Sequence, residues 1–341
     1  MNRNVVLFRK KPAPTDEIYF LNPISPLVGS GRIDLKIYDS RHYFGRKTDI
    51  LQSIQGSRVV VSRYIHPTWL TLLKDHHEKT DGITYIVDDD IPAARNTADL
   101  PGDYRRRMNL AAENEFSPML DLADSIVVTS RYLYERYGSE KTFLLEPGLT
   151  TRFPESSVKS MPMEPLRIIY FATAMHQADL KLIAPSLIRV VERFDNVRID
   201  IVISKIPQPE LSSVPRIRFV KPMSWERYKR FFSKQQAHIL LAPKLDTPYN
   251  LGKSFIKVLD AAACGAAGIY SNVRPYNEVV ENGTDGLLVE NHPEKWLEAL
   301  SRLIENPSEI GRIAQKGRDL ALRIGNPGRL TGFWEERLLR Q

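Results

Sequence analysis

The 341-residue sequence contains one cysteine, Cys264, and no apolar run as long as the ~20 residues that a membrane-spanning helix needs. A single cysteine excludes an intramolecular disulfide and a cysteine-rich metal module, and it indicates a cytoplasmic location. The first apolar run has four residues and ends before Arg9, which makes it too short for a secretory signal. With 42% hydrophobic and 26% charged residues, the composition is that of an ordinary globular protein and not of a fibrous or disordered one.

The seven histidines lack any spacing that is typical of a metal site. His76 and His77 are adjacent, so on a helix they would point in different directions. His176 is the only histidine that we place in a functional site, because it follows a predicted strand closely. We therefore predict no metal site.

Acidic residues do not balance the basic ones, which leaves a net charge of +7. The excess is uneven, because residues 1–160 carry 22 basic against 21 acidic residues and residues 161–341 carry 26 against 20. A basic second half indicates an anionic partner, such as a phosphate-bearing small molecule, a nucleic acid or a lipid headgroup, unless the bias serves only solubility. The sequence has no recognisable nucleic-acid-binding module, so we expect no nucleic-acid partner. Peripheral contact with the inner face of the membrane is compatible with the basic charge.

Short apolar runs bounded by turn residues alternate along the chain with longer segments of helical spacing. Apolar strands that alternate with helices are typical of parallel sheets covered on both faces. Because the pattern occurs twice, we predict two doubly wound, Rossmann-like α/β domains that face a central cleft. The predicted strands are Asn4–Phe8, Asp34–Tyr38, Arg58–Ser62, Thr84–Val87, Ser125–Val128, Thr142–Leu145, Leu166–Phe171, Val197–Ile203, Arg216–Val220, Ala237–Ala242, Ala267–Tyr270 and Gly286–Val289.

Composition also predicts the domain limits. A segment rich in proline and serine with little apolar periodicity separates the two halves and is typical of a linker. We predict an N-terminal domain over residues 1–150, a linker over 151–165, a C-terminal domain over 166–326, and a final helix within 327–341 that packs across the domain junction.

The most informative stretch, KLDTPYNLGKSFIKVLDAAACG, spans Lys244–Gly265. It predicts a strand end, a polar loop and a helix that opens near Lys253 and Ser254. The free N–H groups and the dipole of a helix start suit a phosphate, to which the Ser254 hydroxyl could donate. Lys253, Lys257 and Asp260 have i, i+4, i+7 spacing and would share one helical face, with the lysines on a diphosphate and the carboxylate on a sugar hydroxyl pair. The alternative is that Lys257 and Asp260 form an exposed ion pair without a functional role.

This region resembles the nucleotide-sugar-binding region of GT-B glycosyltransferases of the family 4 type, the glycosyl transferases group 1. In that group a helix ending in Glu-Ala-x-Ala-x-Gly is followed by a strand, a serine, a Pro-x-x-Glu segment and Asn-Gly-x-x-Gly-Leu-Leu-Val. The corresponding elements here are Asp260–Gly265, Ala267–Tyr270, Ser271, Pro275–Glu278 and Asn282–Val289. The resemblance covers about 165 residues from Leu166 onward, and the first domain matches only in outline.

The sequence departs from the family at its pair of glutamates. The family carries two glutamates eight residues apart, and Gly252 and Asp260 occupy those positions here. The first glutamate, which contacts the sugar in the family, is therefore absent. The resemblance implies that Asp260 still meets the ribose and that Lys253 and Lys257 supply the diphosphate contacts.

Polar residues that follow predicted strands supply further candidates. The loop after Phe171 offers His176, Asp179 and Lys181 where the family usually carries an arginine and a lysine. Tyr249 and Asn250 precede the predicted helix and are candidate sugar and phosphate contacts by position, or else ordinary turn residues.

Three adjacent aspartates, Asp88, Asp89 and Asp90, follow a predicted buried strand of the first domain. Adjacent like charges are costly unless they are solvated, paired or metal-bound, and strand ends are where ligands bind. One of them could accept the acceptor hydroxyl or act as a general base if the transfer inverts configuration. The Asp-x-Asp of the other glycosyltransferase fold, GT-A, would instead hold a divalent metal, but the two-domain layout favours GT-B. The structural alternative is that they cap the next segment and pair with Arg95 or Arg105–Arg107.

Two basic segments lie in the first domain. Arg9–Lys11 occupies the place of the family's glycine-rich loop, and Tyr104–Arg107 follows later in the chain. The first could meet the phosphate of a lipid-linked or phosphorylated acceptor, or lie in solvent. The second could contact an anionic acceptor or a membrane surface, or form a solvated helix face. Ser130, after another predicted strand, is most simply a helix N-cap.

The resemblance implies a glycosyltransferase that moves a hexose or deoxyhexose from a nucleotide-diphosphate donor to a hydroxyl of a glycan or lipid-linked glycan, in cell-surface polysaccharide biosynthesis. It further implies a retaining outcome, no essential metal and no cofactor, since the nucleotide-sugar is a co-substrate. The alternative is a catalytically inactive GT-B relative that acts as a partner or regulatory subunit, which the missing glutamate would explain. The candidate catalytic residues are Asp88, Asp89 and Asp90, and the candidate donor-binding residues are His176, Tyr249, Asn250, Lys253, Ser254, Lys257 and Asp260.

Overall fold

The computed structural model describes residues 2–39, 46–150, 165–203, 210–221, 223–232 and 234–339. The predicted linker, residues 151–165, lies outside these ranges except for its last residue. The chain divides into two compact units. The first comprises Met1–Thr150, Leu251–Ser254 and Asn326–Gln341, and the second comprises Thr151–Asn250 and Phe255–Gly325. The sequence did not predict that Leu251–Ser254 belongs with the first unit.

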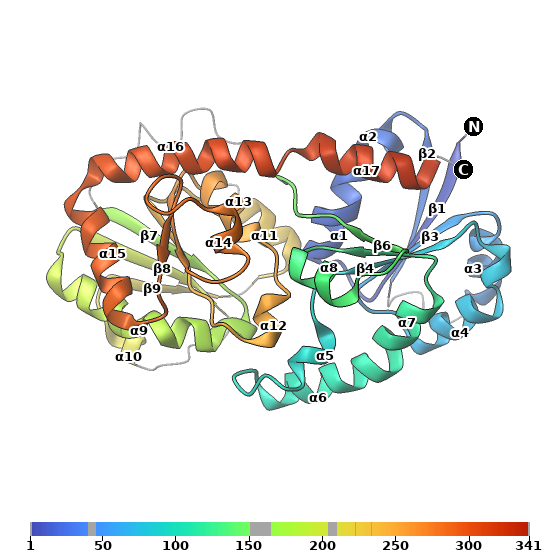
Figure 1. Cartoon of the computed structure of the whole chain (residues 1–341), viewed down its shortest axis with the longest axis horizontal. Coiled ribbons are helices and arrows are strands. Elements are labelled where there is room, and N and C mark those ends of the chain that lie inside the picture. The colour runs from blue at the N-terminus through green and yellow to red at the C-terminus, as the bar shows by residue number, and fades with distance from the viewer. Residues whose placement is uncertain are drawn as a thin grey trace. The chain divides into compact units, whose positions relative to one another are not determined.

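The first unit contains a six-stranded sheet of order β2-β1-β3-β4-β5-β6, in which all neighbouring strands are parallel. Val5 of β1 lies opposite Leu35 of β2 and Arg58 of β3. All five residues of β4 are buried, because helices cover both faces of the sheet (Figure 1). The strands are β1 (Arg3–Arg9), β2 (Ile33–Tyr38), β3 (Arg58–Ser62), β4 (Ile83–Val87), β5 (Ser125–Val128) and β6 (Thr142–Leu144).

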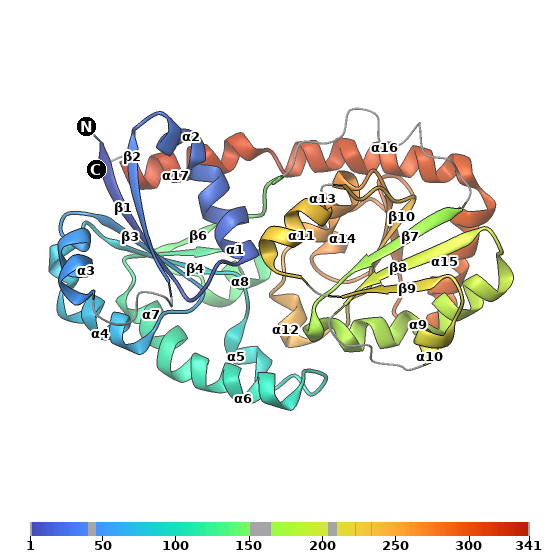
Figure 2. The same cartoon turned by 180° about the vertical axis from the view of Figure 1, so that it is seen from behind.

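The helices of the first unit come from both ends of the chain. The last of them, α17, lies alongside α2 (Figures 1 and 2) and places Leu330, Trp334 and Leu338 in the core of this unit. The prediction that the last helix packs across the domain junction stays a prediction. The helices are α1 (Pro14–Asp16), η1 (Glu17–Leu21), α2 (Asn22–Gly29), α3 (Lys47–Ile54), α4 (Pro67–Asp75), η3 (His77–Lys79), α5 (Ile91–Ala94), α6 (Gly102–Ala111), η4 (Ala112–Phe116), α7 (Ser117–Leu122), α8 (Arg131–Tyr137) and α17 (Pro327–Leu339).

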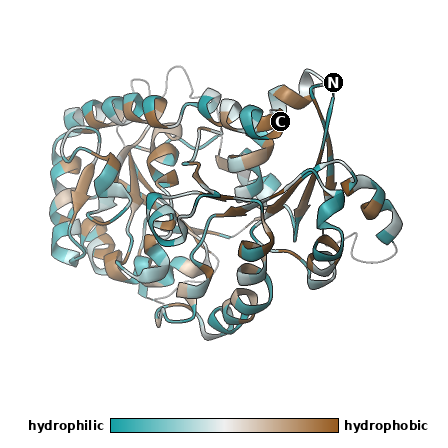
Figure 3. Cartoon of the chain, turned by 45° about the vertical axis from the view of Figure 1, so that its right-hand side comes forward, coloured by the Kyte–Doolittle hydropathy of each residue, from teal (hydrophilic) through white to brown (hydrophobic). Residues whose placement is uncertain are grey.

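The second unit contains another six-stranded parallel sheet, of order β12-β11-β10-β7-β8-β9. Figure 3 shows its strands as predominantly hydrophobic, whereas the helices alternate between hydrophobic and hydrophilic residues along their length. Trp296 of α15 and Leu187 of α9 are fully buried in its core. The strands are β7 (Leu166–Phe171), β8 (Val197–Val202), β9 (Ile217–Val220), β10 (Ile239–Ala242), β11 (Ala267–Ser271) and β12 (Leu287–Val289). The helices are η5 (Ala174–His176), α9 (Gln177–Arg193), α10 (Glu210–Ser213), α11 (Trp225–Phe232), α12 (Pro248–Leu251), α13 (Ile256–Ala263), α14 (Tyr276–Val279), α15 (Pro293–Glu305) and α16 (Pro307–Ile324).

Each sheet has a topological switch point, where consecutive strands begin to be added on the other side of the first strand. The switch lies between β1 and β3 in the first unit and between β7 and β10 in the second. Ligands of doubly wound sheets bind beyond the carboxyl ends of the strands at this point. The residues to examine are therefore those that follow β1 and β3, and those that follow β7 and β10.

The predicted helix start at Lys253 is wrong. Helix α13 begins at Ile256, with the buried Phe255 in the N-cap position, and Lys253 and Ser254 precede it. Lys253 therefore does not share a helical face with Lys257. The physical reason is that residues 251–254 bond to groups of the first unit, as described below. None of the helices in the described residues combines the length and the apolarity that crossing a bilayer requires.

Candidate functional site

The aspartates that follow β4 are held by cations. Thr15 donates its hydroxyl proton to Asp88, and the Arg63 Nε lies 2.8 Å from the Asp88 Oδ1. Asp89 bonds both the guanidinium of Arg63 and the Nζ of Lys253. Burial raises the pKa of Asp88 to about 6. The positive charge of Arg63 lowers this pKa, whereas the negative charge of Asp89 raises it further. The cations offset part of the electrostatic cost of the adjacent carboxylates.

Asp90 has a structural role. Its Oδ1 accepts from the Ala93 N–H at 3.1 Å, which caps α5, and from the Tyr137 hydroxyl at 2.7 Å. The Arg136 Nε lies 2.8 Å from its Oδ2. The prediction that an aspartate caps the next segment is therefore confirmed for Asp90, whereas the expected partner Arg95 bonds Asn109 instead. Among the described residues, no group of three or more His, Cys, Asp and Glu side chains could hold a metal ion.

Arg63, which follows β3, has a strained backbone conformation. Its φ of 58° lies in the left-handed region, which costs a non-glycine residue roughly 1–2 kcal/mol. The conformation is held because the Arg63 N–H donates to the Ile86 carbonyl at 3.1 Å and the Arg63 carbonyl accepts from the Tyr85 hydroxyl at 2.7 Å. Such strain gathers at functional sites. The sequence did not single out Arg63, although its place directly after a strand end was a signal.

Residues 251–254 are bonded to the carboxyl edge of the first sheet. The Tyr19 hydroxyl donates to the Ser254 Oγ at 2.8 Å, and the Ser130 hydroxyl donates to the Gly252 carbonyl at 3.0 Å. Ser130 also accepts from the Leu133 N–H, which confirms that it is an N-cap. Within the first unit, the predicted donor residues Lys253 and Ser254 thus contact Asp89 and Tyr19, and their role in donor binding stays a prediction.

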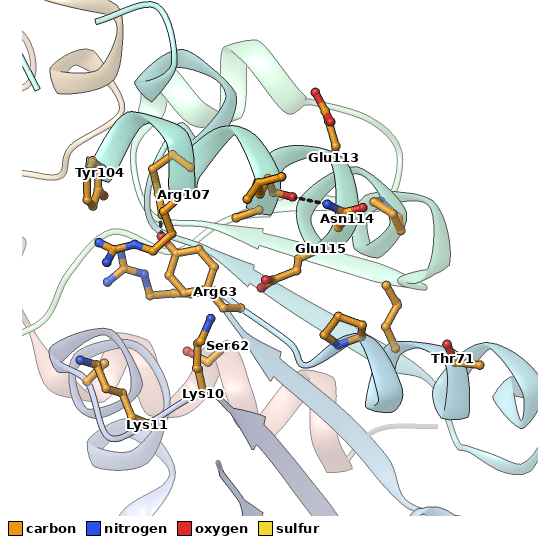
Figure 4. Close-up of a pocket in the computed structure, with 18 of the residues that line it drawn as sticks. Lys10, Lys11, Ser62, Arg63, Thr71, Tyr104, Arg107, Glu113, Asn114 and Glu115 are labelled. Carbon is orange, nitrogen blue, oxygen red and sulfur yellow. Dashed lines mark hydrogen bonds between the residues drawn. The ribbon is translucent and has the colours of Figure 1, made fainter. Parts of the chain in front are cut away.

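A pocket of about 810 Å³ opens at the switch point of the first sheet. It brings together the two basic segments singled out in the sequence, because Lys10 and Lys11 follow β1 while Tyr104 and Arg107 lie on α6. Figure 4 shows Lys10, Lys11, Arg63 and Arg107 gathered at one end of the pocket. Since Arg63 also bonds Asp88 and Asp89, the pocket adjoins the aspartate cluster.

In the second unit, Asp179 links the loops that follow β7 and β10. It is 2% exposed, and its Oδ1 accepts from the Leu245 N–H at 2.8 Å and from the Asn250 Nδ2 at 3.3 Å. Its Oδ2 lies 2.8 Å from the His176 Nδ1, so the carboxylate orients the imidazole. Two predicted donor residues, His176 and Asn250, therefore meet at the switch point, and Tyr249 is buried beside Asn250 on α12.

A second buried network crosses the ends of β10, β11 and β12. The Lys244 N–H donates to the Ser271 Oγ at 2.8 Å, and Ser271 donates to the Asn291 Oδ1 at 2.7 Å. The Asn291 Nδ2 donates to the Lys244 carbonyl at 2.9 Å, and the Lys244 Nζ donates to the Arg274 carbonyl at 2.5 Å. The sequence analysis did not assign Lys244 a role, and its burial to 3% exposure could not be read from the sequence.

Lys257 and Asp260 lie on α13 and form an ion pair, with the Lys257 Nζ 2.8 Å from the Asp260 Oδ2. The pair is about one-fifth exposed, so it is not the fully solvated pair of the structural alternative. The Lys257 Nζ also lies 5.8 Å from the ring centroid of Phe171 at the end of β7. The roles of these two residues in donor binding stay predictions.

An aromatic row on α11 lies beside this pair. Trp225 and Tyr228 stack at 5.6 Å, and Tyr228 packs edge-on against Phe171 at 6.0 Å. Phe232 continues the row at 5.7 Å from Tyr228. The i, i+3, i+7 spacing of Trp225, Tyr228 and Phe232 was the sequence signal for this row.

Comparison with known proteins agrees with this architecture. Residues 166–306 match the model of the family described as glycosyl transferases group 1. The resemblance predicted from the sequence is thus confirmed for residues 166–306, and the chain has the GT-B fold of two Rossmann-like domains. No curated protein matches the sequence.

Solved structures share the fold over the whole chain. The Anabaena protein Alr3699/HepE in complex with UDP and glucose has a TM-score of 0.67 at 12% identity and 99% coverage of each chain. Sucrose-phosphate synthase from Thermosynechococcus elongatus has a TM-score of 0.65 at 14% identity, covering 100% of this chain and 99% of that one. UDP-GlcNAc 2-epimerase from Neisseria meningitidis bound to UDP-GlcNAc has a TM-score of 0.56 at 15% identity, with both chains covered completely. At these identities the likeness concerns the fold, which a synthase and an epimerase share.

Proposed function

We propose that the protein is a glycosyltransferase that moves a sugar from a nucleotide-diphosphate donor to a hydroxyl group of a glycan or lipid-linked glycan. The match of residues 166–306 to glycosyl transferases group 1 carries this proposal. The buried cluster around Asp179 supports it, because doubly wound sheets bind ligands at the switch point where this cluster lies. Transfer of a hexose or deoxyhexose, retention of configuration, independence of metal ions, a role in cell-surface polysaccharide biosynthesis and a cytoplasmic location are part of the proposal.

The second domain would bind the donor. UDP is the first nucleotide to test, because the structures of HepE and of the epimerase contain UDP or UDP-sugars. In this proposal Lys257 contacts the diphosphate and Asp260 contacts the ribose. His176 and Asn250 contact the transferred sugar and the phosphate attached to it. Tyr249, Lys253 and Ser254 remain candidate donor contacts.

The first domain would bind the acceptor near the aspartate cluster. Asp88 is the best placed to accept a hydrogen bond from an acceptor hydroxyl, because its carboxylate has one hydroxyl donor and one cation as partners. Asp90 is the least suited, since capping and Tyr137 occupy its carboxylate.

Thermal unfolding with nucleoside diphosphates and nucleotide-sugars, with and without EDTA, tests the donor assignment. A ligand at 100 times its dissociation constant stabilises the folded state by about 2.7 kcal/mol. We expect a shift with one nucleotide family that EDTA leaves unchanged and that Lys257→Ala removes. Lys295→Ala is the matched control, because Lys295 forms a similar i, i+3 pair with Glu298 at 2.8 Å on the surface of α15. Retention of the full shift in Lys257→Ala would refute the assigned role of Lys257.

Turnover assays separate the enzyme from the inactive alternative. Incubation of the identified nucleotide-sugar with candidate glycan and lipid-linked acceptors should release the nucleoside diphosphate and give a glycosylated product by mass spectrometry. A nucleotide-dependent shift without turnover would favour a regulatory subunit. A shift that requires a divalent metal would contradict the proposed metal independence.

A further inference from the structure

The pocket at the switch point of the first sheet has basic side chains at one end. This cationic end contains Lys10, Lys11, Arg63 and Arg107. It is lined by residues from the ends of β1 and β3 and from α4, α6, η4 and α7, and its volume is about 810 Å³. This volume accommodates a small molecule or the head of a larger one. Because ligands of doubly wound sheets bind at such a place, the pocket is a binding site by topology as well as by shape.

The cations of the pocket differ from the other basic residues nearby. Among the described residues, no ion pair engages Lys10, Lys11, Lys74 or Arg107. By contrast, Arg9 outside the pocket lies 3.3 Å from Asp16, and Arg106, the neighbour of Arg107 on α6, bonds Asp103. These four pocket cations are therefore available to an anionic ligand.

The acidic residues that line the pocket do not neutralise these cations. Asp16 is 1% exposed and already accepts bonds from Arg9, from the Ser62 hydroxyl at 2.6 Å and from a backbone N–H. Figure 4 shows Glu113 pointing away from the cationic end. Glu115 is half-buried, and burial raises its pKa while the nearby charge of Lys10 opposes the rise. The cationic end keeps a positive excess.

Apolar and aromatic groups complete the lining. The Tyr64 ring has the Lys10 Nζ at 5.9 Å and the Arg63 guanidinium at 5.3 Å from its centroid. Met108 forms part of the wall, and Leu110, which also lines the pocket, is 61% exposed. A ligand that combines an anionic head with a less polar chain fits this lining.

We propose that this pocket binds the phosphate or diphosphate group of the acceptor, with Lys10, Lys11 and Arg107 as its cationic ligands. The inference rests on the proposed function, because it names the chemical class of the acceptor of that reaction. Charge-assisted bonds from ammonium and guanidinium groups to phosphate oxygens are the strong ones, and several together select a doubly charged group over a neutral glycan. Arg63 joins the pocket to Asp88 and Asp89, so a bound phosphate and an acceptor hydroxyl would both lie at the carboxyl edge of this sheet.

Calorimetric titration of the full-length protein with inorganic pyrophosphate and with farnesyl diphosphate, each with UDP at saturating concentration, tests the inference. The double variant Lys11→Gln/Arg107→Gln should bind both probes at least about tenfold more weakly, which corresponds to about 1.4 kcal/mol. The matched control is Arg106→Gln, whose side chain is 79% exposed and does not line the pocket, and it should bind them as the unchanged protein does. Equal affinity in the double variant, or no binding by the unchanged protein, would overturn the inference.

The probes also separate the sources of the phosphate. Equal affinity for both supports a phosphorylated glycan, and tighter binding of farnesyl diphosphate supports a lipid-linked acceptor. Binding to phosphatidylcholine vesicles only when they contain phosphatidylglycerol, without affinity for either soluble probe, would overturn the inference in favour of a membrane-surface contact.

Failure of the inference and failure of the proposed function have different signatures. If UDP stabilises the protein and neither phosphate probe binds, only the acceptor class is wrong. If the probes bind and no nucleotide stabilises the protein, the donor assignment is wrong, and the pocket is an anion site without an acceptor role. The double variant should keep its thermal shift with UDP, because its two substitutions lie in the first unit.

Discussion

At the scale of single residues, the pKa of Asp88 is set by effects that oppose one another. The Thr15 hydroxyl and the Arg63 guanidinium favour its charged form, while burial and the neighbouring Asp89 favour its neutral form. Burial has the largest effect and raises the pKa to about 6 from 3.8. The folded protein therefore binds this proton more tightly than the unfolded chain does.

The first prediction follows from this difference in proton affinity. Between pH 3.8 and about 6 the folded state holds more of this proton than the unfolded state, so the Asp88 contribution to the free energy of unfolding falls as the pH rises. The contribution is fully present below pH 3.8 and is lost above the folded-state pKa. Urea unfolding midpoints across this window should fall less steeply in Asp88→Asn than in the unchanged protein. Parallel profiles would contradict the prediction, and Asp103→Asn, at a carboxylate that is 91% exposed, is the control.

The second prediction concerns Gly252, which stands where the family has a glutamate. A Cβ at this position would lie 3.0 Å from the Asp90 backbone nitrogen and 3.1 Å from the Asp90 Cβ. Overpacking of this kind destabilises by about 1–3 kcal/mol. Both Gly252→Ala and the family-like Gly252→Glu should therefore lower the urea midpoint, and Gly252→Glu should not improve turnover.

The control for Gly252 is another glycine of the same unit. Nothing lies within 4 Å of a Cβ at Gly332 on α17, so Gly332→Ala should stabilise by about 0.5–1 kcal/mol through helix propensity. A Gly252→Ala variant as stable as the unchanged protein would mean that the contact with Asp90 relaxes without cost.

At the scale of secondary-structure elements, α17 shows how a helix from the chain end completes a distant core. The Trp334 Nε1–H donates to the Tyr19 carbonyl at 2.6 Å, and the ring meets Phe20 edge-on at 4.8 Å. Both partners belong to η1, more than 300 residues earlier in the chain. The helix is therefore part of the first unit in packing as well as in hydrogen bonding.

The third prediction measures this packing. Trp334→Ala removes a fully buried indole and should lower the free energy of unfolding of the first unit by about 3–5 kcal/mol. Denaturation followed by circular dichroism provides the measurement. Glu335→Ala is the control, because Glu335 makes only an exposed pair with Arg32 and should change stability by less than about 1 kcal/mol.

The strands of the described residues could be predicted because central strands such as β4 and β10 are buried along their whole length, a pattern that depends on local sequence alone. The start of α13 could not, since Lys253 bonds Asp89 and the Gly252 carbonyl bonds Ser130, partners more than 120 residues away. Arg63 escaped the sequence analysis for the same reason, because its two carboxylate partners follow a different strand. Local pattern predicted the elements, and long-range bonds decided where one helix begins and which cations meet the aspartates.

At the scale of the whole molecule, net charge was a poor guide to the cationic pocket. The basic excess lies in residues 161–341, but many of those basic residues form exposed pairs, such as Arg193 with Glu305 and Arg302 with Glu309. The pocket with uncommitted cations lies in the nearly neutral first half. What matters to an anionic ligand is which cations lack a carboxylate partner, and this depends on the fold.

The fourth prediction tests the discontinuous make-up of the first unit. Removal of residues 327–341 should expose the apolar groups of β1 and α2 that α17 covers. The backbone amides of β1 and α2 should then lose their protection against hydrogen exchange. The amides of β7, β8 and α9 in the second unit should keep theirs. Equal loss in both units would contradict the division of the chain.

The same division has a consequence for the order of events during synthesis. Domains are generally completed from the N-terminus onward as the chain emerges from the ribosome. Here the core of the first unit needs Leu330, Trp334 and Leu338, so it stays incomplete until Leu338 has been synthesised, whereas the second unit has received its last residue by Gly325. The half of the protein that is translated first is therefore the half that finishes folding last, and a nascent chain stalled before residue 326 would expose the apolar surface of a unit that still lacks its final helix.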